Sequence, residues 1–288
     1  MALTSLGSAE PGFFIMQLRA IQAPVIAILL IQLLALLLRS NLQLKLIEGG
    51  HGTDYARDLS YLLVPPLLAV LLWPILRSSK NTVKSWFDPG GLTVRLVLTA
   101  VAIGILARVA WWCQLVAGIA LGITVDSRVA APSGPQFWFN CPPLTEFMVG
   151  LLVWVCLIPI VEEFVHRGLI QSALHSRGRC TAIVVSAFLF AAFHPPSAMP
   201  LAFTLGLVFA IQFARSGMLW ASTISHAAYD GLIQFDWRCL HGTWNPRVTD
   251  SSLPDIATLS IVGFMLAAGG IVWLVSGIGA PSAPRSRN

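Results

Sequence analysis

The stretch LTEFMVGLLVWVCLIPIVEEFVHRGLIQSAL, residues 144–174, is long and apolar enough to cross a bilayer, yet it carries Glu162 and Glu163 side by side. A charged residue at the centre of a membrane helix costs roughly 2.5–3.5 kcal/mol on insertion scales, so ionisable residues at this depth indicate a functional site. On one helix Glu163 stands four residues before Arg167, and Glu162 stands four residues before His166. Each carboxylate is therefore expected to have a partner one turn further along.

The composition is that of a membrane protein. Of 288 residues, 56% are hydrophobic and only 11% are charged, and the mean hydropathy is +0.76. Eight apolar runs approach the roughly 20 residues that span the hydrocarbon core: residues 21–38, 59–76, 94–123, 144–174, 181–193, 201–213, 218–233 and 255–278. The sequence predicts an all-α, polytopic transmembrane helical bundle of about eight spans. We divide it into amino-terminal spans (1–143, about three), a core that carries the ionisable motifs (144–235), and an outer loop with the last span and a short tail (236–288).

Basic residues favour one orientation. With the amino terminus inside, ten Lys and Arg residues fall in inner loops and six in outer loops. The positive-inside rule then places both termini in the cytoplasm, as in a multi-pass protein of a bacterial inner membrane. The net charge of +5 reflects this orientation and contact with anionic lipid, and no motif or basic stripe indicates nucleic acid. Cys141 and Cys239 fall in outer loops, where a disulfide is permitted, and the sequence leaves open whether they are bonded.

Two later runs add His194, and then His226 with Asp230 one turn further on. At about 1.5 Å of rise per residue, Glu162, His194 and Asp230 lie about 18–20 Å from the cytoplasmic ends of their helices, and His226 about 14 Å. The four side chains are therefore expected at one level near mid-bilayer. A carboxylate facing an imidazole can hold and deprotonate a water, and further donors can stabilise an oxyanion.

Three motifs now stand in order on successive spans: Glu-Glu-x-x-x-Arg at 162–167, Phe-x-x-x-His at 190–194 and His-x-x-x-Asp at 226–230. Together they resemble the CAAX-type or bacteriocin-processing intramembrane glutamic proteases, over residues 144–235. The resemblance implies an endopeptidase that cuts near the cytoplasmic leaflet. The site residues that it implies are Glu162 and His194 to activate water, His226 and Asp230 for the oxyanion, and Glu163 and Arg167 as support. Asp230 stands where many members have Asn, and an Asp donates a hydrogen bond only when it is protonated.

The resemblance implies no cofactor and a substrate that is a peptide or a membrane protein, with or without a lipid group. Zinc is the rival, because Glu162, His194 and His226 offer two imidazoles and a carboxylate. A non-catalytic immunity or membrane-partner protein is another alternative, and a proton-coupled transporter a third. No feature of the sequence indicates an oligomeric state.

Overall fold

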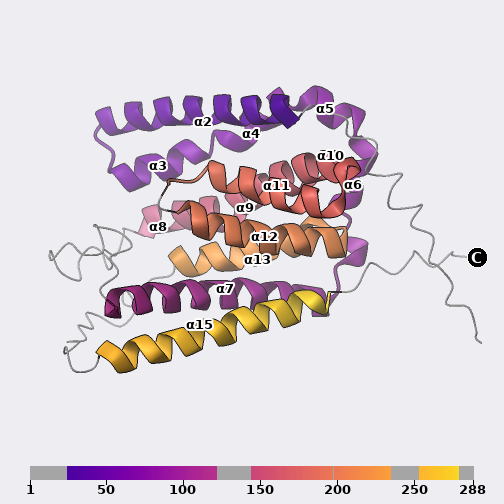
Figure 1. The fold of residues 1–288 in the computed structure, drawn as a ribbon. Coiled ribbons are helices and arrows are strands. Elements are labelled where there is room, and N and C mark those ends of the chain that lie inside the picture. Colours follow the sequence, from indigo (N-terminus) through magenta and orange to yellow (C-terminus); the bar gives the residue numbers. More distant parts are fainter. Residues whose placement is uncertain (1–24, 122–143, 197, 235–252, 279–288) are drawn as a thin grey trace, which may run out of the picture.

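The computed structural model describes residues 25–121, 144–196, 198–234 and 253–278. Every regular element in these ranges is helical and none is a strand, so the all-α prediction is confirmed. The helices lie side by side along a common direction in one bundle (Figure 1). The elements are α2 (Val25–Glu48), α3 (Thr53–Tyr61), α4 (Val64–Leu71), α5 (Trp73–Ser78), α6 (Lys80–Trp86), η1 (Pro89–Gly91), α7 (Val94–Ala120), α8 (Leu144–Leu151), η3 (Leu152–Leu157), α9 (Ile158–Glu163), η4 (Phe164–Gln171), α10 (Ser172–Leu174), η5 (His175–Arg177), α11 (Arg179–Ala192), α12 (Met199–Ser216), α13 (Leu219–Gln234) and α15 (Leu253–Ser276). Cys141 and Cys239 lie outside the described residues.

Five helices of the described residues are long and apolar enough to cross a membrane, against about eight spans expected. They are Val25–Glu48, Val94–Gly118, Leu144–Arg177, Met199–Ser216 and Ala257–Ser276. The remaining runs are helical but shorter: α11 has 14 residues and α13 has 16. The protein is an integral membrane protein by the length and composition of these helices.

The second expected run is broken for a local reason. Residues 59–76 form parts of α3, α4 and α5 instead of one helix. Pro65 and Pro66 stand in the first turn of α4, and Pro74 in the first turn of α5. A proline has no N–H to donate and clashes with the preceding turn, so each helix begins anew at these positions.

The span that carries the two glutamates also departs from a regular α-helix. It includes two π-helical segments, η3 and η4, on either side of α9. Pro159 lies in the first turn of α9 and cannot donate to the preceding turn, and η3 ends just before it. Wider π turns commonly accompany such breaks and functional sites. Glu162 and Glu163 therefore end a short α-helical segment between two π turns.

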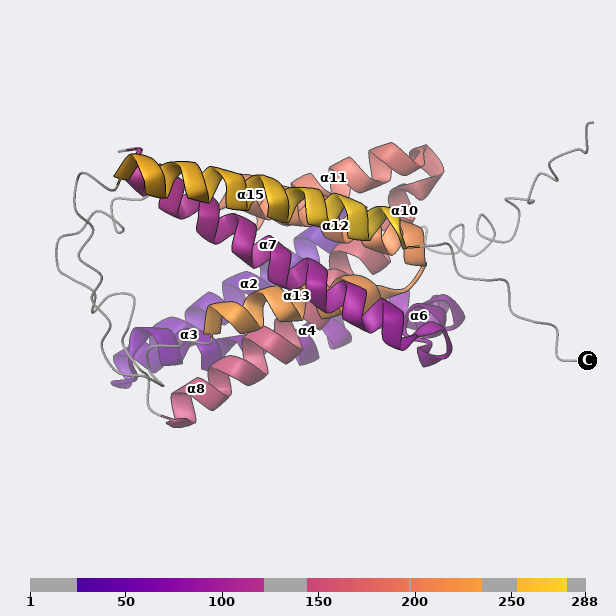
Figure 2. The ribbon, with the colours of Figure 1, turned by 90° about the horizontal axis from the view of Figure 1, so that it is seen from below.

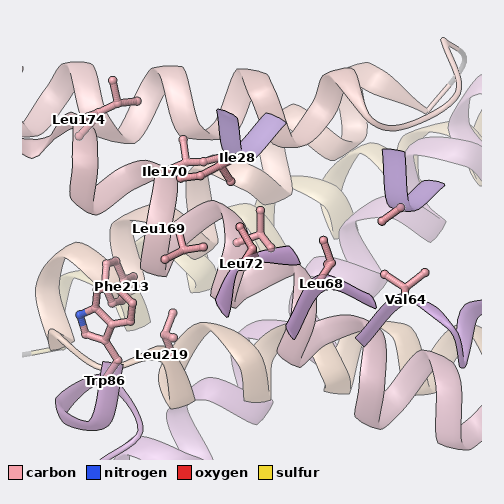
Figure 3. Packing of buried hydrophobic residues seen from close by; sticks show 13 residues of the cluster. Ile28, Val64, Leu68, Leu72, Trp86, Leu169, Ile170, Leu174, Phe213 and Leu219 are labelled. Atoms are coloured by element: carbon pink, nitrogen blue, oxygen red, sulfur yellow. The ribbon is translucent and has the colours of Figure 1, made fainter. Parts of the chain in front are cut away.

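A buried apolar cluster packs around η4. Its members include residues of α2, α4, α6, η4, α10, α11, α12 and α13, among them Ile28, Leu68, Leu169 and Leu219 (Figure 3). Trp86 of α6 lies against Gly168 of η4, where an added Cβ would stand 2.9 Å from the indole ring. Small residues let membrane helices approach closely, so close packing fixes the segment that follows the glutamates.

Candidate active site

The two neighbouring glutamates occupy different environments. The Glu163 side chain is 0% exposed, and its Oε2 lies 3.1 Å from Nε of Arg167, whose side chain is also 0% exposed. The Glu162 side chain is 25% exposed and lines a cavity. One carboxylate is thus neutralised inside the protein, while the other can reach a bound molecule.

Arg167 is held by three groups at once. Besides Glu163, its Nη1 donates to Ser186 Oγ at 3.0 Å, and its guanidinium lies 5.0 Å from the centroid of the Phe190 ring. Ser186 Oγ in turn donates to the backbone carbonyl of His166 at 2.8 Å. Arg167 therefore ties η4 to α11, the helix that leads to His194.

His226 sits between three carboxylates. Its Nδ1 is 3.2 Å from Glu163 Oε1, and its Nε2 is 3.3 Å from Asp230 Oδ2 and 3.8 Å from Glu162 Oε2. Ionised carboxylates only accept hydrogen bonds, so a ring with a proton on both nitrogens satisfies both sides. Phe209 stacks on the imidazole with centroids 4.9 Å apart and planes at 22°, which fixes the plane of the ring.

His194 follows the end of α11 and is oriented by its own helix. Its Nδ1 is 2.9 Å from the carbonyl oxygen of Phe190. Because a carbonyl only accepts, Nδ1 is the donor, and Nε2 of the neutral ring is left as an acceptor. The Phe190 ring packs on His194 with centroids 4.7 Å apart. His194 thus offers an acceptor nitrogen to the cavity.

The cavity gathers the predicted residues. It has a volume of about 350 Å³, and its wall includes Glu162, His194, His226 and Asp230. Apolar side chains from α9, α12 and α13 form much of the remaining wall, among them Ile158, Leu201, Leu205 and Ile233. The structure therefore brings four of the six predicted site residues to one cavity and keeps Glu163 and Arg167 buried behind it.

One expected pairing is wrong. His166 does not partner Glu162, because its Nε2 lies 3.1 Å from Nε2 of Gln32 on α2. The π-helical backbone of η4 is the physical reason: a turn wider than 3.6 residues rotates His166 away from the face that Glu162 occupies. Arg167 has a longer side chain and still reaches Glu163 from the same segment.

The comparisons with known proteins agree with this geometry. Residues 144–232 match the family model of the type II CAAX prenyl endopeptidase Rce1-like proteins. This segment is similar to that family. The matched segment begins with α8 and ends in α13, so it contains all three motifs and every predicted site residue. The resemblance to CAAX-type proteases is thereby confirmed at the level of the family. Comparisons with curated proteins and with solved structures give no match.

Zinc ligation is not supported by the side-chain positions. Within the described parts of the chain, no group of three or more His, Cys, Asp or Glu side chains is arranged to hold a metal ion. Both ring nitrogens of His226 already face carboxylates. A metal-free reaction stays a prediction, which chelation tests.

Sequence reasoning missed residues that shape the cavity. Arg57 of α3 and Trp154 of η3 line it, and both bond to Asp58, Arg57 Nε at 3.0 Å and Trp154 Nε1 at 2.9 Å. The sequence gives one signal for them, which is a pair of opposite charges just before an apolar run. Tyr229 of α13 also lines the cavity.

Proposed function

We propose that this protein is an intramembrane glutamic endopeptidase that hydrolyses a peptide bond with a water held between Glu162 and His194. One observation carries the proposal: of two adjacent glutamates, only Glu162 is exposed to a cavity that His194, His226 and Asp230 also line. The match of residues 144–232 to CAAX prenyl endopeptidases supports the same class of reaction.

In the proposed mechanism Glu162 takes a proton from the water, while Nε2 of His194 accepts a hydrogen bond from it. The water oxygen attacks the carbonyl carbon of the scissile bond, and the electron pair of the C=O bond moves to oxygen. The Nε2–H of His226 turns from Asp230 to donate to this oxyanion, while its Nδ1–H stays bonded to Glu163 and keeps the ring in place. Collapse of the tetrahedral intermediate breaks the C–N bond, and Glu162 returns its proton to the leaving amine. General-base catalysis typically raises the rate by roughly 10²–10⁴-fold. One oxyanion donor typically raises it by roughly 10²–10³-fold.

Glu163 and Arg167 have a supporting role in this mechanism. Glu163 accepts from His226 Nδ1 and is neutralised by Arg167, so it fixes the ring without reaching the substrate. A carboxylate locked in this way is poorly placed to activate water. The assignment of the base to Glu162 follows from the difference in exposure.

The experiment uses the full-length protein in detergent with two fluorogenic peptides. One carries an isoprenylated Cys three residues from its carboxyl terminus, and the other is the same peptide without the lipid. Glu162→Gln is compared with wild type and with Glu146→Gln, a matched control in α8 of the same span. We expect Glu162→Gln alone to abolish cleavage. Cleavage by Glu162→Gln at the wild-type rate would refute the mechanism, and a phenotype in cells that survives this change would favour the non-catalytic partner protein.

We further propose a bacterial inner-membrane location with both termini cytoplasmic. One end of the bundle carries α5, α6 and the start of α7, and the other carries α3 and the start of α8 (Figure 1). The basic residues near the first end are Arg77, Lys80, Lys84, Arg95, Arg177, Arg179 and Arg215. Acidic residues near the opposite end include Glu48, Asp54, Asp58, Glu146 and Asp255. The positive-inside rule then makes the first end cytoplasmic.

This orientation changes the expected side of cleavage. The wall of the cavity includes Arg57 of α3 and Ala198, which follows the turn after α11, and both belong to the acidic end of the bundle. The cavity therefore opens away from the basic face. With the termini cytoplasmic, we propose that peptides reach Glu162 from the outer side instead of near the cytoplasmic leaflet.

Cysteine labelling tests the orientation. In a variant whose native cysteines are replaced by Ser, Ala198→Cys is compared with Lys84→Cys in intact cells, using a membrane-impermeant maleimide. We expect labelling of Ala198→Cys only, with Lys84→Cys labelled after the cells are opened. The reverse pattern would place the cavity mouth in the cytoplasm and the basic end outside.

A further inference from the structure

Arg108 is a buried cation that the three motifs do not include. It lies near the middle of α7, outside the matched segment, and is 8% exposed. No carboxylate of the described residues lies within 4.0 Å of it, and its Nε has no hydrogen-bond partner there. An arginine at this depth in a membrane is costly, so its position calls for a compensating partner.

The packing of α7 on α13 determines what Arg108 faces. Ala100 and Gly104 precede it at four-residue intervals on the same face of α7. Ser225 Oγ donates to the Ala100 carbonyl at 2.7 Å. A Cβ at Gly104 would stand 2.8 Å from Cβ of Ala228 and would collide with the backbone oxygen of Ser225. The two helices therefore touch backbone to backbone at Gly104, where α7 crosses α13 (Figure 2).

One turn beyond that contact, the Arg108 side chain lies beside Tyr229, a residue of the cavity wall. Its guanidinium carbon is 5.7 Å from the centroid of the Tyr229 ring. Asp230 is the next residue along α13 after Tyr229. Trp111 covers the guanidinium with its ring centroid at 4.1 Å. Tyr229 and Asp230 both line the cavity, so Arg108 stands directly behind its wall.

We propose that Arg108 is a positioning residue of the site, which compensates the charge of Asp230 and holds Tyr229 against the cavity wall. The inference rests on the proposed function for its catalytic consequence. Three carboxylates, Glu162, Glu163 and Asp230, surround His226, and Arg167 contacts only Glu163. Arg108 supplies the second fixed cation, from the side of Asp230.

The carboxylate at position 230 is the reason that a second cation is needed here. A neutral amide needs no countercharge, whereas a buried carboxylate without one is strongly destabilised. Arg108 permits Asp230 to be a charged acceptor for His226 Nε2 at 3.3 Å. Arg108 and Asp230 should therefore behave as a coupled pair although they do not touch.

A double-mutant cycle tests the coupling, with wild type, Arg108→Ala, Asp230→Asn and the double variant in detergent. The measurements are kcat and KM on the cleaved peptide and the apparent melting temperature. In the presence of Asp230, Arg108→Ala should lower kcat about 10-fold with a smaller effect on KM, within the coupling expected for residues of one network. In the Asp230→Asn background the same change should lower kcat by no more than about 2-fold. Arg95→Ala, an exposed arginine at the start of α7, serves as the matched control and should show no coupling.

Equal effects of Arg108→Ala in both backgrounds would overturn the proposal, as would an Arg108→Ala variant with unchanged kcat. If Arg108→Ala does not accumulate in membranes, abundance becomes the readout: recovery in the double variant supports the coupling, and failure of both variants refutes it. The melting data separate this inference from the proposed function. If no peptide is cut but the melting temperatures still show the coupling, the proposed endopeptidase function is refuted. The pairing of Arg108 with Asp230 is then still supported.

Discussion

Replacing Arg167 by alanine should destabilise the protein more than any other single change at the site. The variant leaves Glu163 with a buried carboxylate that has lost its countercharge 3.1 Å away. His226 still faces Glu163 through Nδ1, but its Nε2 faces the carboxylates of Glu162 and Asp230. Its positive charge is therefore divided among three carboxylates and does not replace that of Arg167. The stranded charge sits in a segment with no access to water, since both side chains of the pair are 0% exposed.

The size of the effect follows from these contacts. Removing one partner of a buried ion pair costs about 3–5 kcal/mol. The loss of the donor to Ser186 and of the contact with the Phe190 ring acts in the same direction. For a chain of this size 1 kcal/mol corresponds to about 2–4 °C, so the apparent melting temperature should fall by roughly 6–20 °C.

The assay is thermal unfolding in detergent, followed by the fraction of protein that stays monodisperse. Arg179→Ala is the matched control, because Arg179 is exposed and donates only to a backbone carbonyl, that of Ala214. The free energy of unfolding of Arg179→Ala should differ from that of wild type by no more than about 0.5 kcal/mol. Adding Glu163→Gln to Arg167→Ala should recover part of the loss, since it removes the stranded charge. An unchanged melting temperature in Arg167→Ala, with activity lost, would refute the structural role and place Arg167 in substrate binding.

The remaining predictions concern the chemistry and the packing around it. Glu162→Gln and His194→Ala should each lower kcat by about 10²–10⁴-fold with normal melting, and either variant at the wild-type rate would contradict the roles given to them. Chelators should leave activity unchanged, whereas loss on chelation followed by recovery with zinc would establish the metal alternative. Asp230→Asn should lower activity at every pH measured, because an amide is a weaker acceptor for His226; a gain restricted to alkaline pH would show instead that a protonated Asp230 donates to the oxyanion. Gly206→Val should reduce activity at normal abundance or lower both, because even a Cβ at this position would stand 3.1–3.2 Å from Ala187, so the larger side chain would push α12 away from α11; unchanged activity would show that this contact does not position His194.

Much of the membrane architecture could be predicted because it depends on local patterns. Apolar runs of sufficient length predict helices that cross a bilayer. The run at 59–76 is an exception, because it is expected as one span and instead begins new helices near Pro65 and Pro74. The pairing of Glu163 with Arg167 is also local, since helix geometry alone brings residues four apart together. The order and depth of the three motifs likewise follow from counting residues along helices, and they led to the family that the match to residues 144–232 confirms.

Tertiary structure decided which side chain faces which. Glu162 and Glu163 are adjacent and chemically identical, and only the packing of α11 and α13 exposes one and buries the other. His166 faces Gln32 because the π-helical segment η4 changes which side of the helix His166 occupies. The spacing of residues in the sequence does not predict this segment. Arg108 meets Tyr229 only because Gly104 lets α7 touch α13. Periodicity along one helix determines which residues share a face, but the partner of that face comes from a helix far away in the sequence, and the electrostatic surroundings of a buried charge are set by that partner.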